Sequence, residues 1–148
     1  MIRRLMLLAA AMAVSGLVVG ACSAGGTSPE MSNARIAQPT GPNTAMYFTA
    51  DGYGTDDRLI GATVDIATEV QVHETVMNDD GTMGMNHVGA VDLPAEGQIV
   101  LEPGGLHLMF LDVERLEVGD VVEVSLQWRE AGDVKMDVEV VAPGDTGG

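Results

Sequence analysis

Short β-prone runs separated by turn residues dominate the sequence, and this spacing constrains the fold more than any other feature. Gly, Pro, Asn or Asp stands between most neighbouring runs, and no window keeps a long 3.6-residue period. Strands recurring about every ten residues are typical of a single-domain, all-β antiparallel sandwich or barrel. The expected strands are 44–50, 58–64, 69–74, 97–101, 106–112, 121–128 and 134–141. The last two predict a hairpin with one wet face.

The first 21 residues have the pattern of an export signal. Two arginines precede an apolar run over 5–19, and small residues follow. This run is shorter than the roughly 20 residues that a membrane-spanning helix needs. The sole cysteine, Cys22, comes next, and the segment 19–22 resembles the lipobox of bacterial lipoproteins. It predicts lipidation of Cys22 and an extracytoplasmic protein anchored in the cell membrane. A plain secretory signal with an incidental cysteine is the alternative.

The remaining chain divides by composition. Residues 22–33 are small and polar and predict a flexible tether. Residues 34–142 hold the β-prone runs and form the expected β-sandwich domain. Residues 143–148 are rich in glycine and predict a frayed tail.

The charge of the chain excludes one large class of partner. Seven basic residues stand against 22 acidic ones, a net charge of −15. Removal of residues 1–21 takes away two arginines, which leaves five basic residues against 22 acidic ones and a net charge of −17. A nucleic-acid binder needs the opposite sign, so no nucleic-acid partner is expected. The negative charge favours solubility and raises the local concentration of cations.

The sequence lacks the common motifs of catalysis. It has no Cys-x-x-Cys, no phosphate-binding Gly-x-x-x-x-Gly-Lys and no Gly-x-Ser-x-Gly. The acidic pair at 79–80, followed by Gly81, lacks the other ligands of a calcium loop and predicts a hairpin tip. We therefore expect a protein that is not an enzyme.

Histidine and methionine cluster in one part of the chain. The stretch from 73 to 109 holds all three histidines and four of the seven methionines that follow residue 21: His73, His87, His107, Met77, Met83, Met85 and Met109. Met83 and Met85 are two residues apart, as are His107 and Met109. On a strand, residues with that spacing share a face, so each pair can present two donors to one point.

Thioether and imidazole together favour a particular metal. Thioether sulfur is soft and suits Cu(I), and imidazole suits copper as well. A neutral set of two His and two Met stabilises a monocation better than a dication. Without a nearby thiolate, a blue-copper site is excluded. The competing interpretation is that the methionines pack in the core, as expected of Met46 and Met136, that His107 is an ordinary bonded histidine and that His87 caps a turn.

These residues resemble the signature of the PCuAC family of bacterial extracytoplasmic copper(I) chaperones. The family motif is a His, ten residues, a Met, 21 residues and His-x-Met. Met85 and His107 have the matching 21 residues between them, whereas His73 and Met85 have eleven. The extra residue fits the tip at 78–81, and Met83 is the alternative ligand. Further similarities at 57–62, 93–95, 101–105 and 116–120 extend the resemblance over most of 34–141.

The resemblance implies a fold, a site and a role. The fold is a cupredoxin-like Greek-key sandwich. The ligands of one Cu(I) are His73, Met85, His107 and Met109, with Met83 and His87 as additional donors. The role is delivery of Cu(I) towards the CuA centre of cytochrome c oxidase, alongside Sco-type assembly proteins, by a protein that we expect to be a monomer. The alternatives are copper storage or detoxification, and a structural surface lipoprotein that binds no metal.

Overall fold

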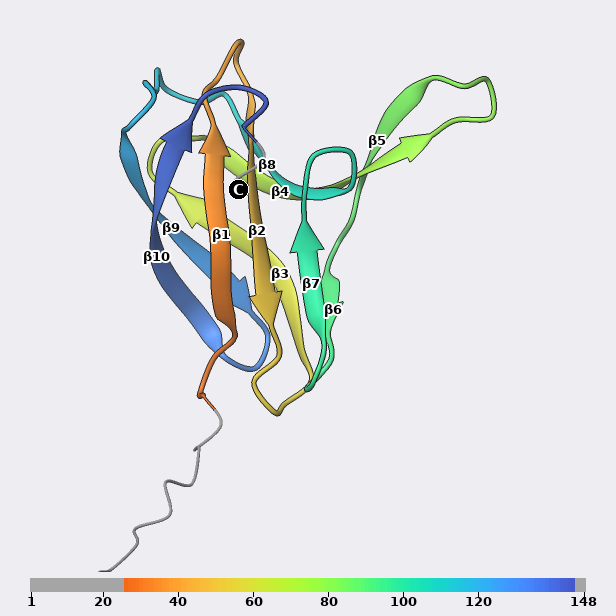
Figure 1. Ribbon diagram of the computed structural model, residues 1–148, viewed down its shortest axis with the longest axis vertical. Helices are drawn as coiled ribbons and strands as arrows, with labels where there is room; N and C mark the ends of the chain where they lie inside the picture. The colour runs from red at the N-terminus through yellow and green to blue at the C-terminus, as the bar shows by residue number, and fades with distance from the viewer. Residues whose placement is uncertain (1–25, 146–148) are drawn as a thin grey trace, which may run out of the picture.

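The computed structural model describes residues 26–145, and its regular elements are all strands (Figure 1). They are β1 (Glu30–Ala37), β2 (Thr44–Asp51), β3 (Asp57–Val64), β4 (Glu69–Met77), β5 (Met83–His87), β6 (Val91–Leu93), β7 (Gln98–Leu101), β8 (Leu106–Leu111), β9 (Val121–Trp128) and β10 (Gly132–Val141). Within this part of the chain, no helix is both long and apolar enough to cross a membrane.

The strands form an open cupredoxin-like sandwich. Their hydrogen-bonded order is β5-β4-β8-β2-β1-β10-β9-β3-β6, and β7 pairs with β2 beside β8. All pairs are antiparallel except β1 with β10, which run parallel and side by side (Figure 1). The predicted antiparallel sandwich is confirmed, and this one pair departs from its antiparallel pattern. These strands come from opposite ends of the domain, so no tight turn fixes their relative direction.

The core follows the two-residue alternation of the strands. In β2, Met46, Phe48 and Ala50 are buried while the residues between them are only half-buried. β9 alternates in the same way and buries Leu126 and Trp128. Successive side chains of a strand point to opposite faces, so one face of each strand enters the core. The other face is free to carry polar groups or ligands. The packing role predicted for Met46 is confirmed by its complete burial.

All seven expected strands are present, and β9 and β10 form the predicted hairpin. Three further strands, β1, β5 and β6, were not predicted. β1 begins at Glu30, so the prediction of a tether over 22–33 is wrong for its last four residues. Their polar side chains show no apolar alternation, although their backbone pairs with β2, for example Ser32 with Thr49. A register shift between Ser32 and Arg35, with Asn33 at a φ of 54°, further obscures the pattern.

Some predictions concern residues outside the described range. The signal over 1–21, the lipidation of Cys22 and the last three residues of the tail all lie there. In the described part of the tail, the carbonyl oxygen of Asp145 accepts a hydrogen bond of 3.2 Å from Arg35 Nε.

Candidate metal centre

The three histidines form a row across the sheet. The register places His73 of β4 between His87 of β5 and His107 of β8. The ring centroids of His73 and His107 are 5.8 Å apart, and those of His73 and His87 are 5.9 Å apart. The neighbouring residues Val72 and Leu108 enter the core, so the histidines lie on the outer face of the sheet. Histidines that are between 14 and 34 residues apart in sequence therefore meet at this face.

Two thioethers lie on the same face, one on each side of the histidine row. Met109 of β8 is opposite Gln71, two residues before His73 on β4. Met85 of β5 is opposite Thr75, two residues after His73. Each methionine is thus about 7 Å along the strands from the row, within the combined reach of these long side chains. The structure places all four predicted ligands on one face.

The two other predicted donors lie at the edges of this arrangement. Met83 pairs with Met77 near the hairpin tip, about 13 Å along β5 from the histidine row. His87 lies in the row but on the edge strand, where it is exposed. The register therefore favours Met85 over Met83 as a partner of His73. β4 and β5 pair without a register shift, which leaves the tip as the place for the extra residue of the motif.

His73 is held through one ring nitrogen. Its Nε2 lies 2.8 Å from Oε1 of Gln71, and the side-chain amide of Gln71 donates to Oε1 of Glu69 at 2.7 Å. A carboxylate can only accept, so the amide oxygen of Gln71 must face the imidazole. Nε2 therefore carries the proton and donates it. Nδ1 keeps its lone pair, and it is buried without a hydrogen-bond partner.

His107 repeats this arrangement with its nitrogens exchanged. Its Nδ1 donates to the backbone carbonyl of Gly105 at 3.1 Å, which leaves Nε2 buried and without a partner. The side chain is only 2% exposed, although it lies on the outer face. A buried polar atom without a partner costs roughly 1–3 kcal/mol, so two in neighbouring rings are unusual unless a ligand satisfies them. Metal-binding histidines have this arrangement, with one nitrogen anchored and the other free.

Electrostatics keep His73 neutral. Burial lowers the pKa of its imidazole below the usual 6.5, and the neighbouring His107 and His87 lower this pKa further when they are charged. The neutral form dominates at pH 7, so the Nδ1 lone pair is available to a metal. Among residues 26–145, no three His, Cys, Asp or Glu side chains, the three histidines included, form a group that could hold a metal ion by themselves.

An aromatic ring and a cation border the histidine row on the side of β2 and β1. The ring of Tyr47 lies 6.4 Å from that of His107, and the guanidinium of Arg35 lies 5.3 Å above the tyrosine ring. Burial raises the pKa of the Tyr47 hydroxyl, which Arg35 partly offsets. Sequence reasoning missed these two residues and Gln71, because their roles depend on strand pairing across β4, β8, β2 and β1.

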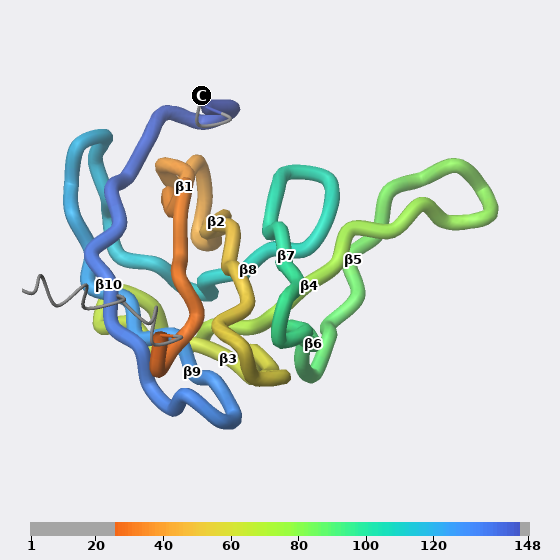
Figure 2. Tube along the Cα trace, turned by 60° about the horizontal axis from the view of Figure 1, so that its bottom comes forward, coloured from red at the N-terminus to blue at the C-terminus, as the bar shows by residue number. Residues whose placement is uncertain are grey.

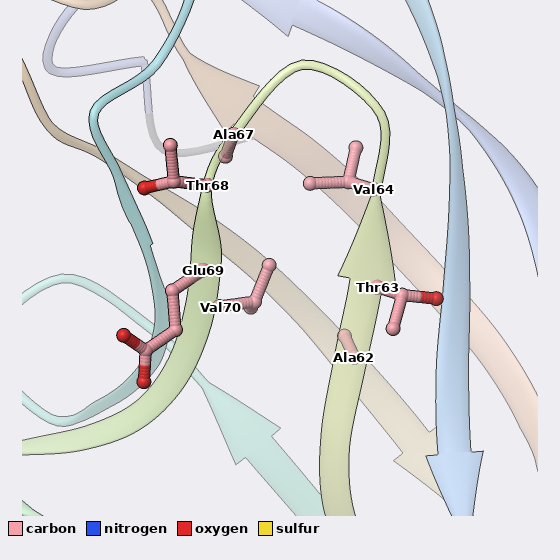
Figure 3. Close-up of a pocket in the computed structure, with 7 residues that line it drawn as sticks. All are labelled: Ala62, Thr63, Val64, Ala67, Thr68, Glu69 and Val70. Atoms are coloured by element: carbon pink, nitrogen blue, oxygen red, sulfur yellow. The ribbon is translucent and has the colours of Figure 1, made fainter.

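A separate hollow lies where β3 turns into β4 (Figure 3). Small and apolar side chains such as Val64, Ala67 and Val70 line most of it, and Glu69 is its only ionisable residue. In Figure 3 the carboxylate of Glu69 points away from Thr63 and Val64 of the facing strand, and no other polar group converges with it. The histidine and methionine face is therefore the better candidate for a site.

The fold and the site together define a class: a small cupredoxin-like β-sandwich with imidazole and thioether donors on one outer face. Residues 30–140 match the family described as "LpqE-like: Putative lipoprotein LpqE-like", and the chain belongs to that family. One curated relative, "Putative lipoprotein Lxx21020" of Leifsonia xyli subsp. xyli, is 29% identical over 83 residues. That match covers 55% of this chain, and it spans about half of the length of the relative (50%).

Solved PCuAC domains have the same fold. The copper-bound PCuAC domain from PmoF2 matches with a TM-score of 0.64 and 25% identity. The match covers 76% of this chain and 92% of that domain. The apo PCuAC domain from PmoF1 has the same TM-score and coverage at 27% identity. The solution structure of CuI-DR1885 from Deinococcus radiodurans has a TM-score of 0.61 at 25% identity, with 80% of each chain covered. The resemblance to the PCuAC family is thereby confirmed.

Proposed function

We propose that this protein is an extracytoplasmic copper(I) chaperone, not an enzyme, that binds one Cu(I) through His73, Met85, His107 and Met109. The observation that carries the proposal is the pair of buried, unpartnered nitrogens, Nδ1 of His73 and Nε2 of His107. The two rings are neighbours at 5.8 Å, and thioethers flank them on the same face. Neutral soft donors favour Cu(I) over dications. The copper-bound state of related PCuAC domains supports this choice of metal.

The exposure of the ligands suits transfer better than permanent storage. His107 is 2% exposed, whereas Met85 is 57% exposed. A partner protein can therefore displace the outer thioether first while the imidazoles still hold the ion. The absence of a thiolate among the ligands keeps each bond weak enough to exchange. By family resemblance, the recipient is the CuA centre of cytochrome c oxidase, reached together with Sco-type proteins.

The proposed location is the outer side of the cell membrane. Membership in a lipoprotein family and the sequence around Cys22 support a lipid anchor there. An anchored carrier searches for its recipient in two dimensions, next to other membrane proteins. A net charge of −17 on the exported chain attracts cations and basic partners.

The test is a Cu(I) competition titration against a chromogenic chelator at pH 7 under reducing conditions. The parent protein should bind one equivalent with high affinity. The double variant His107→Ala/Met109→Ala should lose this binding. Met136→Leu, which removes a half-buried thioether of β10 far from the site, is the matched control and should bind as the parent does. Unchanged affinity in the double variant would refute the ligand assignment.

A further inference from the structure

The β4–β5 hairpin carries a second group of thioethers beyond the proposed site. Met77, Met83 and Met85 are 73%, 61% and 57% exposed. They are the only methionines among the exposed large hydrophobic side chains of residues 26–145. Two views show the distal part of this hairpin extending away from the rest of the sandwich (Figures 1 and 2). Core packing therefore cannot explain methionine at these positions.

The hairpin register brings these side chains together. The backbone N of Asn78 donates to the backbone O of Thr82, and the backbone N of Val88 donates to the backbone O of Val72, both at 2.8 Å. Between these two positions of the hairpin, hydrogen-bonded and non-hydrogen-bonded residue pairs alternate. Met77 and Met83 therefore form a non-hydrogen-bonded pair, the type with Cα atoms only about 4.5 Å apart. Both side chains lie on the face that carries His73. Met85 is diagonal to Met77 on that face, within reach of its flexible side chain.

The tip fixes this pair in register. Asn78 Nδ2 donates to Thr82 Oγ1 at 3.0 Å, and the backbone N and the Oγ1 of Thr82 both donate to Asp80 Oδ1 at 3.0 and 2.6 Å. Gly81 adopts a φ of 80°, which suits glycine in a tight turn. The turn residues thus hold Met77 and Met83 opposite each other before any ligand arrives.

The charge of the hairpin favours a cation. Residues 69–88 contain four carboxylates and no Lys or Arg. Two of the carboxylates, Asp79 and Asp80, are at the tip. Hydrogen bonds from Thr82 lower the pKa of Asp80, so this group stays ionised. An exposed thioether pair below an acidic tip provides soft ligands for Cu(I) and an electrostatic field that attracts it.

We infer that Met77 and Met83 form a second, weaker Cu(I) site that shares Met85 with the first and passes the ion to and from it. This inference rests on the proposed function and adds an exchange route to it. Two or three thioethers without imidazole bind Cu(I) more loosely than the His/Met site, so the outer site fills second. Exposure falls from Met77 through Met85 to His107, which defines a path from solvent to the buried nitrogens.

The experiment is an anaerobic Cu(I) titration of the mature chain labelled with ¹³C-methyl methionine and followed by NMR. The first equivalent should shift the methyl signals of Met85 and Met109. The second should shift those of Met77 and Met83. In Met77→Leu/Met83→Leu, the stoichiometry should fall from two to one, the affinity of the first site should stay unchanged, and transfer to an acceptor chelator should slow. Both positions are exposed, so leucine is tolerated there.

The outcomes separate this inference from the proposed function. Shifts of Met77 and Met83 without any effect of His107→Ala on Cu(I) affinity would refute the first site alone. One strong equivalent at Met85 and Met109, with Met77 and Met83 silent, would overturn the second site alone. Shifts of Met83 already in the first equivalent would also overturn a separate second site. Met31→Leu/Met136→Leu is the matched control and should keep both equivalents and the parent's transfer rate.

Discussion

Replacing Gln71 by leucine tests how the protein orients its candidate ligand His73. Gln71 accepts the Nε2 proton of His73 at 2.8 Å and donates to Glu69 at 2.7 Å. Leucine has a similar size but no acceptor, so the imidazole loses the bond that directs its Nδ1 lone pair to the site. A hydrogen bond of this kind contributes roughly 0.5–1.5 kcal/mol, or about 2- to 12-fold in affinity. Groups that orient metal ligands typically contribute 10- to 100-fold, so we expect about tenfold weaker Cu(I) binding.

Competition against a chromogenic Cu(I) chelator measures this change in affinity, and two further variants serve as controls. Gln71→Glu keeps an acceptor oxygen within reach of His73 and should bind at least as well as the parent. Gln98→Leu removes an amide that donates to Asp51 at 2.6 Å, away from the site, and should leave affinity unchanged. Parent-like affinity in Gln71→Leu would refute the orienting role. An equal loss in Gln98→Leu would show that the effect is not specific to the site.

Three other predictions address stability, ligand choice and physiology. Asp57→Asn should lower the free energy of unfolding by about 1–3 kcal/mol at pH 7, because an amide nitrogen replaces the oxygen that accepts from Ala131 N. Burial raises the pKa of Asp57, but hydrogen bonds from Glu130, Arg58, Tyr53 and Ala131 outweigh it and lower the pKa below 3.8. The carboxylate therefore contributes its stability above the pKa that Asp57 has in the unfolded chain, and this contribution is lost as pH falls through the pKa of the folded state. Urea unfolding near pH 3 should therefore show a smaller difference in the free energy of unfolding between Asp57→Asn and the parent. Met85→Leu should weaken the first Cu(I) equivalent by at least about tenfold, whereas Met83→Leu should leave it intact; the reverse result would assign Met83 as the ligand. A deletion strain should lose cytochrome c oxidase activity under copper limitation and regain it with added copper, whereas full activity with copper sensitivity would favour storage.

The strand pattern was predictable because most strands here have one buried face. Alternation in β2 and β9 follows directly from residues such as Phe48 and Trp128, whose burial fixes the register. β1 and β5 escaped prediction because they carry little apolar periodicity. Glu30 and Ser32 lie on a strand that is defined by backbone pairing on both sides, and β5 is an edge strand whose methionines face solvent. Such strands have no hydrophobic pattern to find.

The grouping of the candidate donors on one face was predictable, but the orientation of their side chains was not. Spacing alone placed His107 and Met109 on one face, and the register agrees. No pattern in the sequence indicates that Gly105 and Gln71 hold opposite nitrogens of the two imidazoles, because these bonds depend on strand geometry. Arg35 and Tyr47 join the row only because β1 and β2 pair beside β8. Tertiary pairing thus decides which lone pairs are free.

The candidate site lies on the outer face of the sheet, apart from the residues that stabilise the core. The core is built from the opposite side of the same strands, so Val72 and Leu108 stabilise the sheet while His73 and His107 stay available. Exposed thioethers such as Met85 contribute little to folding, and their substitution should change copper binding at almost no cost in stability. Asp57 is the reverse case, because it ties the start of β3 to the β9–β10 turn and lies away from the ligands. A variant at Asp57 that altered Cu(I) affinity at full folding would contradict this separation.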